Sequence, residues 1–267
     1  MMDRYAVIGN PVDHSLSPRI HAAFATRTGE DIEYGRLEAP ADGFAGAARR
    51  FFAEGGKGLN VTLPFKLDAW RWVESHDDAA ASAGAVNTIV VDSKAIRGCN
   101  TDGIGLVRDL LDNLGWGLDG ARTLVLGAGG AAQGVIEPLK LAGATDLTIA
   151  NRTLRRAQAL AARFGVASAG LDEVGCGWDV VLNATAAGLA GVGGLVATDV
   201  VSVSRCYDMF YSLDGATPFC RWAAEQGAGA VSDGLGMLIE QAAEAFYLWR
   251  RVRPDTGGIA EALRAGA

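Results

Sequence analysis

Residues 58–66, GLNVTLPFK, bring three hydrogen-bonding side chains to the end of one predicted strand. Apolar residues alternate there with Asn60 and Thr62, a pattern typical of a half-buried strand. The amide and the hydroxyl can both donate and accept hydrogen bonds. Pro64 cannot donate to a strand ladder, so the strand ends there and the ammonium group of Lys66 follows. Together these groups could hold a polar ligand.

Other polar clusters occur at Ser15 and Ser17, at residues 87–88 and at residues 100–102. The two serines approach a predicted helix, and their hydroxyls could hold an anion such as a carboxylate. Ser17 also suits the N-cap of that helix, and the two roles are compatible. Taken singly, the remaining clusters, including Asp102 before a glycine, are typical of turns and caps.

A glycine-rich loop, VLGAGGAA, follows a predicted apolar strand and opens a predicted helix. Gly127, Gly129 and Ala132 fit the pattern of a dinucleotide-binding loop, in which they give a tight turn, close approach of a pyrophosphate, and close helix–strand packing. The helix N-terminus adds amide donors and a partial positive charge. The alternative is a glycine-rich connection without a ligand, but the strand–loop–helix context favours binding.

The next strand ends in Asn151, Arg152 and Thr153, where NAD-specific loops usually carry an acidic residue. A carboxylate would repel a 2′-phosphate, whereas Arg152 would bind it through charge-assisted hydrogen bonds. Thr153 could add a donor. Arg155 alone could simply belong to a solvated basic helix start. The strand end therefore predicts NADP(H) rather than NAD(H).

Strands and helices alternate along most of the chain, which predicts an α/β fold with a mainly parallel sheet. Predicted strands lie at residues 5–11, 32–39, 58–66, 85–91, 122–126, 146–150, 179–185 and 205–211. Predicted helices lie at residues 17–29, 43–56, 217–227 and 237–252, with another after the turn at 96–103. The glycine-rich residues 188–197 predict a loop. A second α/β unit, of Rossmann type, begins near residue 122.

Composition narrows the class of protein further. The chain has 267 residues, is 49% hydrophobic and carries a formal net charge of −7. This length suits one large domain or two modest ones, and the acidic balance does not favour nucleic-acid binding. Four cysteines without CxxC spacing indicate free thiols rather than a metal site. No apolar run is long enough for a signal peptide or a membrane helix. A cytoplasmic protein is predicted.

Ten short motifs occur along the chain in the order found in the shikimate dehydrogenase family, which the chain therefore resembles. The resemblance extends from Tyr5 to about Trp249, and its order and spacing make it specific. The motifs are GNPVDHSLSP, GLNVTLPFK, GAVNT, NTDGIG, GAGGAA, NRT, NAT, YDMFY, TPF and DGLGMLIEQAAEAF.

This resemblance implies a substrate-binding and catalytic domain at residues 1–102, an NADP-binding Rossmann domain at 103–236, and C-terminal helices at 237–267 that pack on the first domain. The implied reaction is reversible hydride transfer between NADPH and the C3 carbonyl of 3-dehydroshikimate, which gives shikimate. Lys66 and Asp102 match the family's catalytic pair. A carbonyl that accepts hydride develops alkoxide charge, which an ammonium can stabilise and protonate, while Asp102 can bind a ring hydroxyl and fix the lysine.

The other implied site residues fall into two sets. The residues implied to bind substrate are Ser15 and Ser17 for the carboxylate, Asn60, Thr62, Asn87 and Gln241 for the ring hydroxyls or the carboxylate, and Tyr211 for closure on the carboxylate side. The residues implied to bind the cofactor are Gly127 at the tight turn of the loop, Ala128, Gly129, Gly130 and Ala131 for the pyrophosphate, Asn151, Arg152, Thr153 and Arg156 for the 2′-phosphate, and Thr185, Met209 and Gly234 for the nicotinamide.

The sequence leaves several alternatives open. An NAD-linked quinate/shikimate dehydrogenase is disfavoured by Arg152, and an aminoshikimate substrate is not decided by sequence. A non-catalytic NADP-sensing module is disfavoured because both Lys66 and Asp102 are present. The segment after Tyr211 is one residue longer than usual in the family, which leaves the reach of that side chain open. Both a monomer and a homodimer are compatible with the sequence.

Overall fold

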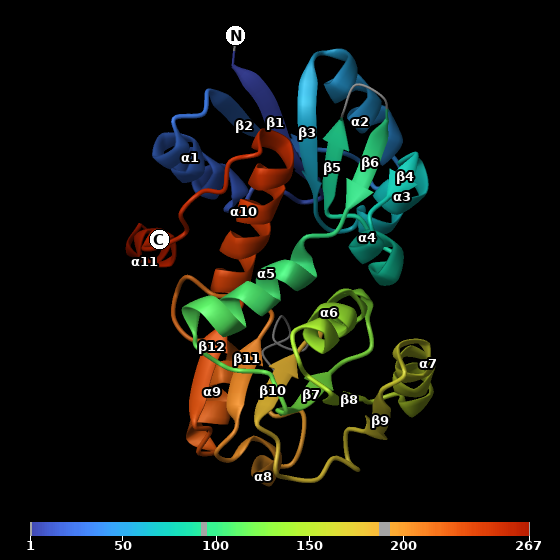
Figure 1. The fold of residues 1–267 in the computed structure, drawn as a ribbon, viewed down its shortest axis with the longest axis vertical. Coiled ribbons are helices and arrows are strands. Elements are labelled where there is room, and N and C mark those ends of the chain that lie inside the picture. Colours follow the sequence, from blue (N-terminus) through green and yellow to red (C-terminus); the bar gives the residue numbers. More distant parts are fainter. Residues whose placement is uncertain (1, 92–94, 187–192, 267) are drawn as a thin grey trace. The chain divides into compact units, whose positions relative to one another are not determined.

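The computed structural model describes residues 2–91, 95–186 and 193–266. It divides into two compact units, each with one six-stranded sheet flanked by helices (Figure 1). Unit 1 comprises residues 1–105 and 239–263, and unit 2 comprises residues 106–238 and 264–267. The predicted α/β fold with a Rossmann unit is therefore confirmed.

The sheet of unit 1 is mainly parallel, in the order β2-β1-β3-β5-β6-β4. β5 runs antiparallel to both β3 and β6. Its strands are β1 (Asp3–Gly9), β2 (Ile32–Glu38), β3 (Gly56–Val61), β4 (Ser75–His76), β5 (Thr88–Val91) and β6 (Ile96–Cys99). Its helices are α1 (Ser17–Thr28), α2 (Phe44–Ala53), α3 (Lys66–Trp72) and α4 (Asp78–Ala83), together with the start of α5 (Asp102–Arg108) and most of α10 (Leu235–Arg250). The chain thus passes from unit 1 to unit 2 within α5 and returns within α10.

The sheet of unit 2 is wholly parallel, in the order β12-β11-β10-β7-β8-β9. Counted from β7, this is the doubly wound order of a Rossmann fold, in which ligands bind where the strand order reverses, between β7 and β10. Its strands are β7 (Arg122–Leu126), β8 (Asp146–Asn151), β9 (Ala167–Gly170), β10 (Val180–Asn183), β11 (Arg205–Asp208) and β12 (Ala230–Asp233). Its remaining elements are the π-helix η1 (Asp109–Asn113) and the helices α6 (Gly130–Leu141), α7 (Leu154–Phe164), α8 (Thr198–Val201) and α9 (Pro218–Glu225). The last helix of the chain, α11 (Ile259–Ala265), belongs mostly to unit 1.

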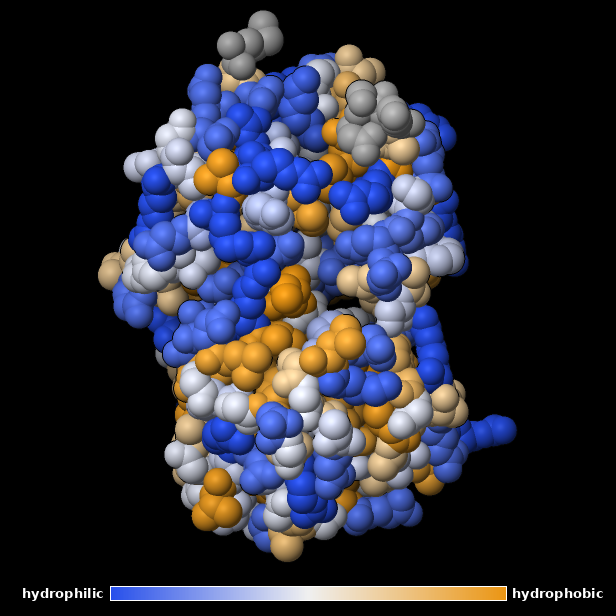
Figure 2. Space-filling model, in the orientation of Figure 1, coloured by the Kyte–Doolittle hydropathy of each residue, from blue (hydrophilic) through white to orange (hydrophobic). Residues whose placement is uncertain are grey.

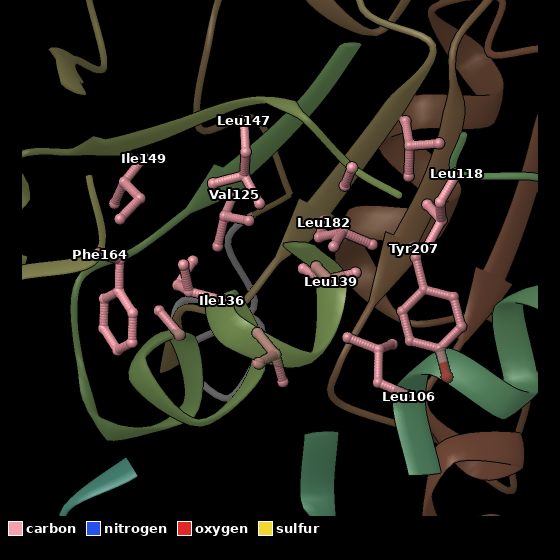
Figure 3. Packing of buried hydrophobic residues seen from close by; sticks show 14 of the residues in the cluster. Leu106, Leu118, Val125, Ile136, Leu139, Leu147, Ile149, Phe164, Leu182 and Tyr207 are labelled. Carbon is pink, nitrogen blue, oxygen red and sulfur yellow. The ribbon is translucent and has the colours of Figure 1, made fainter. Parts of the chain in front are cut away.

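Each unit has its own apolar core. In unit 2, Val125 and Leu182 from the central strands pack with Ile136 and Leu139 of α6, and Tyr207 belongs to the same cluster, at its side near Leu106 (Figure 3). In unit 1, Ile8 and Leu59 of the sheet belong to a cluster with buried phenylalanines, among them Phe65 just before α3. These cores fix the strand ends, which carry the site residues.

Three local expectations need correction. Ser17 is not the N-cap of α1, because that position is Leu16 and makes no side-chain cap bond; instead the Ser15 hydroxyl accepts the backbone N–H of Ser17 at 3.3 Å. The segment predicted as a turn at 96–99 is strand β6. A side chain at Gly98 would meet Val86, so the glycine there reflects close packing rather than a turn.

Helix α3 is the third correction. The strand predicted for residues 58–66 ends at Val61, and α3 begins at Lys66 itself, directly after Phe65. Of the predicted loop at 188–197, residues 188–192 lie outside the described part of the chain, and residues 193–197 carry no helix or strand.

On the face drawn in Figure 2, hydrophilic residues cover most of unit 1, and hydrophobic residues form smaller areas in both units. Among the described residues, none of the helices is long and apolar enough to cross a membrane.

Candidate active site

An ion pair in unit 1 joins the first residues of two helices. The Nζ atom of Lys66, at the start of α3, lies 2.5 Å from Oδ2 of Asp102, at the start of α5. Both side chains are partly buried, which strengthens the pair while leaving the ammonium accessible. The arrangement holds one positive charge in a fixed place beside a carboxylate.

The other carboxylate oxygen of this pair is held by Asn87. Its Nδ2 atom donates to Oδ1 of Asp102 at 2.8 Å, and its Oδ1 atom accepts the backbone N–H of Thr101 at 2.8 Å. Gln241, on α10, offers Oε1 to Nδ2 of Asn87 and to the Thr101 hydroxyl, both at 3.3 Å. Asp102 is therefore fixed from both oxygens, and Lys66 is fixed through it.

Asn60 is buried and its amide is already used within the unit. Its Oδ1 atom accepts from the Tyr34 hydroxyl at 2.7 Å, and its Nδ2 atom donates to the Thr88 hydroxyl at 3.0 Å and to the Asn87 carbonyl at 3.3 Å. The side chain thus braces β3 against β5.

The two serines follow β1, and Thr62 follows β3, which pairs with β1. Ser15 is partly buried and Ser17 is buried. Thr62 follows β3, and its methyl group lies so close to Gly9 that a Cβ there would come within 2.5 Å. Within the described ranges, no hydrogen-bond partner of the Thr62 hydroxyl is found, so this hydroxyl can serve a ligand.

The glycine loop in unit 2 joins the end of β7 to the N-terminus of α6. Gly127 has a φ of 111°, and a Cβ there would meet the backbone of Ala184, so both conformation and space require glycine. Gly129 and Gly130 differ, because a Cβ at either would meet none of the described residues within 4 Å. The described part of the chain leaves that space open, as a loop that receives a pyrophosphate on its main chain should.

The end of β8 lies beside this loop, since the N–H of Gly127 donates to the carbonyl of Ala150 at 2.7 Å. Arg152, Thr153 and Arg156 are exposed there. The first turn of α7 has no acidic residue, and the Thr153 side chain makes no cap bond. Cations at a helix N-terminus are unfavourable by themselves, so this basic start suits a bound anion.

Three predicted nicotinamide-pocket residues follow neighbouring strands. Thr185 donates through its N–H and its hydroxyl to Oδ1 of Asn183, at 3.1 and 2.7 Å. The N–H of Met209 donates to the Asn183 carbonyl at 2.9 Å. Gly234 lies so close to the Met209 carbonyl that a Cβ would come within 2.5 Å.

The structure therefore gathers the predicted residues into two groups. Unit 1 holds Lys66, Asp102, Ser15, Ser17, Asn60, Thr62, Asn87 and Gln241, and unit 2 holds Gly127, Ala128, Gly129, Gly130, Ala131, Asn151, Arg152, Thr153, Arg156, Thr185, Met209 and Gly234. Tyr211 is the exception among the predicted substrate residues, because it belongs to unit 2, where it stacks on Phe210 with ring centroids 6.0 Å apart. Burial raises the pKa of its phenol.

The residues of unit 2 fit a dinucleotide, because an open glycine cradle, a helix N-terminus and an exposed arginine follow adjacent strands. No cluster of three or more His, Cys, Asp or Glu side chains that could hold a metal occurs in residues 2–91, 95–186 and 193–266.

Sequence reasoning missed several supporting side chains. Tyr34 holds Asn60, and Asp208 bonds to Asn183 and Thr217. Thr101 belongs to the polar cluster noted at residues 100–102, and the structure adds that it joins Asn87 to Gln241. Asn183 and Asp208 are the last residues of β10 and β11, and they belong to the motifs NAT and YDMFY. Their position at strand ends was the signal that could have found them.

Three family profiles match the chain in succession. The shikimate dehydrogenase substrate binding domain matches residues 7–89, the shikimate / quinate 5-dehydrogenase family matches residues 109–205, and the shikimate 5′-dehydrogenase C-terminal domain matches residues 234–264.

Individual proteins match over nearly the whole length. Shikimate dehydrogenase (NADP(+)) of Methylobacillus flagellatus is 51% identical, with 99% of this chain and 100% of the relative covered. The structure of an Ael1 enzyme from Pseudomonas putida superposes with a TM-score of 0.94 at 42% identity, covering 98% of each chain. Shikimate 5-dehydrogenase from Thermus thermophilus, in complex with NADP(H) and shikimate, gives a TM-score of 0.88 at 33% identity and 100% coverage of both chains.

Proposed function

The chain belongs to the shikimate dehydrogenase family, and we propose that it catalyses the reversible NADP-dependent reduction of 3-dehydroshikimate to shikimate, a step of the shikimate pathway toward chorismate and the aromatic amino acids. The observation that carries this proposal is the Lys66–Asp102 pair, with Nζ 2.5 Å from Oδ2 and the second oxygen held by Asn87. A sensor would have no need of such a pair.

We assign substrate binding and catalysis to residues 1–102, NADP binding to residues 103–236, and support of the substrate domain to the helices at 237–267. The last assignment is supported by α10, where Trp249 donates to the Ile89 carbonyl at 3.0 Å and Arg250 pairs with Asp3 and Glu30.

NADPH, when bound, supplies the hydride to the carbonyl carbon. The ammonium of Lys66 stabilises the negative charge that develops on the carbonyl oxygen and gives it a proton, which yields the alcohol. The lysine then regains a proton from solvent. Asp102 keeps the ammonium in place and accepts a hydrogen bond from a ring hydroxyl, while Asn87 holds that carboxylate in position.

The remaining residues of unit 1 bind the polyol acid. Ser15 and Ser17 donate to its carboxylate, and Thr62 and Gln241 contact the ring hydroxyls or the carboxylate. Asn60 acts at this site too, and its internal hydrogen bonds favour a bracing role for its amide. Tyr211 closes on the carboxylate side.

In unit 2, Gly127, Ala128, Gly129, Gly130 and Ala131 hold the pyrophosphate, and Asn151, Arg152, Thr153 and Arg156 hold the 2′-phosphate. Thr185, Met209 and Gly234 line the nicotinamide pocket. The open space at Gly129 and Gly130 and the exposed arginines at the start of α7 support this assignment.

A second candidate is a dehydrogenase that accepts quinate or an aminoshikimate as well. The profile that matches residues 109–205 describes a shikimate / quinate family, which favours this as the runner-up. Arg152 disfavours the NAD-linked version, because its charge matches a 2′-phosphate.

One panel of assays separates these candidates. Purified protein is incubated with shikimate, quinate or amino-shikimate, each with NADP or NAD, and the nicotinamide absorbance is followed. We expect the highest kcat/KM with shikimate and NADP. Equal rates with quinate would favour the second candidate, and no turnover with any substrate would favour a sensor.

We also propose a cytoplasmic location, in keeping with cysteines that are free thiols, three of them buried. The assembly is a monomer or a homodimer, and sedimentation of the purified protein distinguishes the two.

A further inference from the structure

Asp208 is a fully buried carboxylate at the end of β11 that takes no part in the mechanism above. Its oxygens accept three hydrogen bonds, from Nδ2 of Asn183 at 3.0 Å, the N–H of Phe210 at 3.2 Å and the Thr217 hydroxyl at 2.7 Å. In the described part of the chain, none of the ion pairs includes it. Dipolar donors therefore compensate its burial.

The donors come from three different segments. Asn183 ends β10, Phe210 lies in the loop after β11, and Thr217 is the N-cap of α9, where its oxygen also accepts the N–H of Cys220 at 3.2 Å. Burial raises the pKa of Asp208, and these three hydrogen bonds oppose that shift.

Each predicted nicotinamide-pocket residue is tied to this network. Thr185 bonds to the Asn183 side chain, and Met209 follows Asp208 and donates to the Asn183 carbonyl. Gly234 donates to the carbonyl of Phe210 at 3.0 Å, and the N–H of Phe210 is held by Asp208.

The residues assigned to the 2′-phosphate have a separate set of bonds. Asn151 donates to the Thr153 carbonyl at 3.0 Å, and the N–H of Arg156 donates to the same carbonyl at 2.9 Å. None of the hydrogen bonds seen in residues 95–186 and 193–266 links these residues to Asp208. The network therefore serves one end of the cofactor site only.

We propose that Asp208 is a positioning residue for the nicotinamide end of the cofactor site, because its carboxylate fixes the loops that carry Thr185, Met209 and Gly234. The inference rests on the proposed NADP function and extends it to a residue that touches neither substrate nor cofactor. It separates two determinants of affinity, a buried one for the nicotinamide and an exposed one for the 2′-phosphate.

The test compares two ligands on the full chain. NADPH carries the nicotinamide, whereas adenosine 2′,5′-bisphosphate carries the 2′-phosphate without it. Asp208→Asn keeps the size of the side chain but replaces one accepting oxygen with an NH2 group, which then faces one of the three hydrogen-bond donors. This variant should weaken NADPH binding about tenfold or more and leave bisphosphate binding unchanged. Arg152→Ala, the matched control, should weaken both ligands.

Thr217 gives a second, milder pair of variants. Thr217→Val removes the hydroxyl at nearly constant shape. It should weaken NADPH binding less than Asp208→Asn does and leave bisphosphate binding unchanged. Thr217→Ser keeps the hydroxyl and should bind both ligands like the wild type. If Asp208→Asn does not fold, these two variants still test the role of the hydrogen bonds to Asp208.

Two results would overturn the inference. Either NADPH binding is unchanged in folded Asp208→Asn and Thr217→Val, or both ligands lose affinity alike in these variants. A wild type that bound neither ligand would instead overturn the proposed function, and this inference with it, so the two failures can be told apart.

Discussion

The two candidate binding regions are built on opposite principles. In unit 1, Asn60, Asn87 and Thr101 are buried and hydrogen-bonded to one another or to their neighbours, and the charges beside them are those of the Lys66–Asp102 ion pair. In unit 2, the cofactor edge presents main chain at Gly129 and an exposed Arg152. The polar groups of unit 1 are already bonded to one another, whereas this edge of unit 2 leaves its main chain and its guanidinium exposed.

This difference follows from the ligands that we assign. The carbonyl group of the substrate is neutral, and negative charge develops on its oxygen only during the reaction. Groups that are already in place stabilise this charge most effectively. A phosphate brings its full charge from the start, so exposed donors and one guanidinium suffice to bind it. Positions that look unconstrained in the protein alone, such as Gly129, are then constrained by the ligand.

The largest expected effect lies at the ion pair. Lys66→Ala should lower kcat about 100-fold or more, because the developing alkoxide loses its proton donor, while shikimate still binds. Steady-state kinetics together with shikimate binding by calorimetry measure this. Lys57→Ala, which removes an exposed lysine of β3, is the control and should turn over normally. Near-normal turnover in Lys66→Ala would remove that lysine from the mechanism.

At the exposed edge, Arg152→Ala should raise KM for NADP about tenfold or more and leave KM for NAD nearly unchanged. The reason is that only NADP carries the 2′-phosphate. Parallel titrations of both cofactors test this, and Arg155→Ala should have a smaller effect. Equal changes for NADP and NAD would refute the 2′-phosphate role.

Gly129→Ala tests whether the ligand, not the protein, requires glycine. Among residues 2–91, 95–186 and 193–266, no neighbour lies within 4 Å of a Cβ placed there, so Tm should stay at the wild-type value. Cofactor affinity should fall about tenfold because the methyl group stands where a pyrophosphate approaches the backbone. A lower Tm with unchanged cofactor affinity would show that the protein, and not the ligand, requires glycine at this position. Gly127→Ala, at a φ of 111°, should lower Tm as well.

The smallest change is expected from Tyr34→Phe. It leaves the buried Oδ1 of Asn60 without its 2.7 Å partner. Loss of one such bond should lower the free energy of unfolding by about 1–3 kcal/mol, which a urea titration measures. KM for shikimate should rise a few-fold, with KM for NADP unchanged. A change confined to KM for NADP would contradict the separation of the two regions.

The two regions also differ in how far sequence alone could describe them. The glycine loop and Arg152 follow consecutive strands and form a local pattern, so their places on a Rossmann unit could be predicted. The network of unit 1 could not, because Asn87 and Gln241 are 154 residues apart and meet only through the packing of α10. Only the family resemblance brought those residues together in advance.

Short elements fixed by tertiary contacts were also missed. β6 exists because it pairs with β5, and α3 begins at Lys66 although a proline two residues earlier suggested only the end of a strand. The buried carboxylate of Asp208 gave no local signal other than its place at a strand end. The sequence thus indicated the residues that we assign to ligands better than the residues that hold them in place.

The central claim is that Lys66 serves the carbon that exchanges hydride with NADP. A crystal structure of the chain with shikimate and NADP measures this directly, as the distance from Nζ of Lys66 to the oxygen on the ring carbon that faces the nicotinamide. We expect a hydrogen-bond distance of about 2.6–3.2 Å. An Nζ atom directed away from that oxygen, with another donor in its place, would contradict the account.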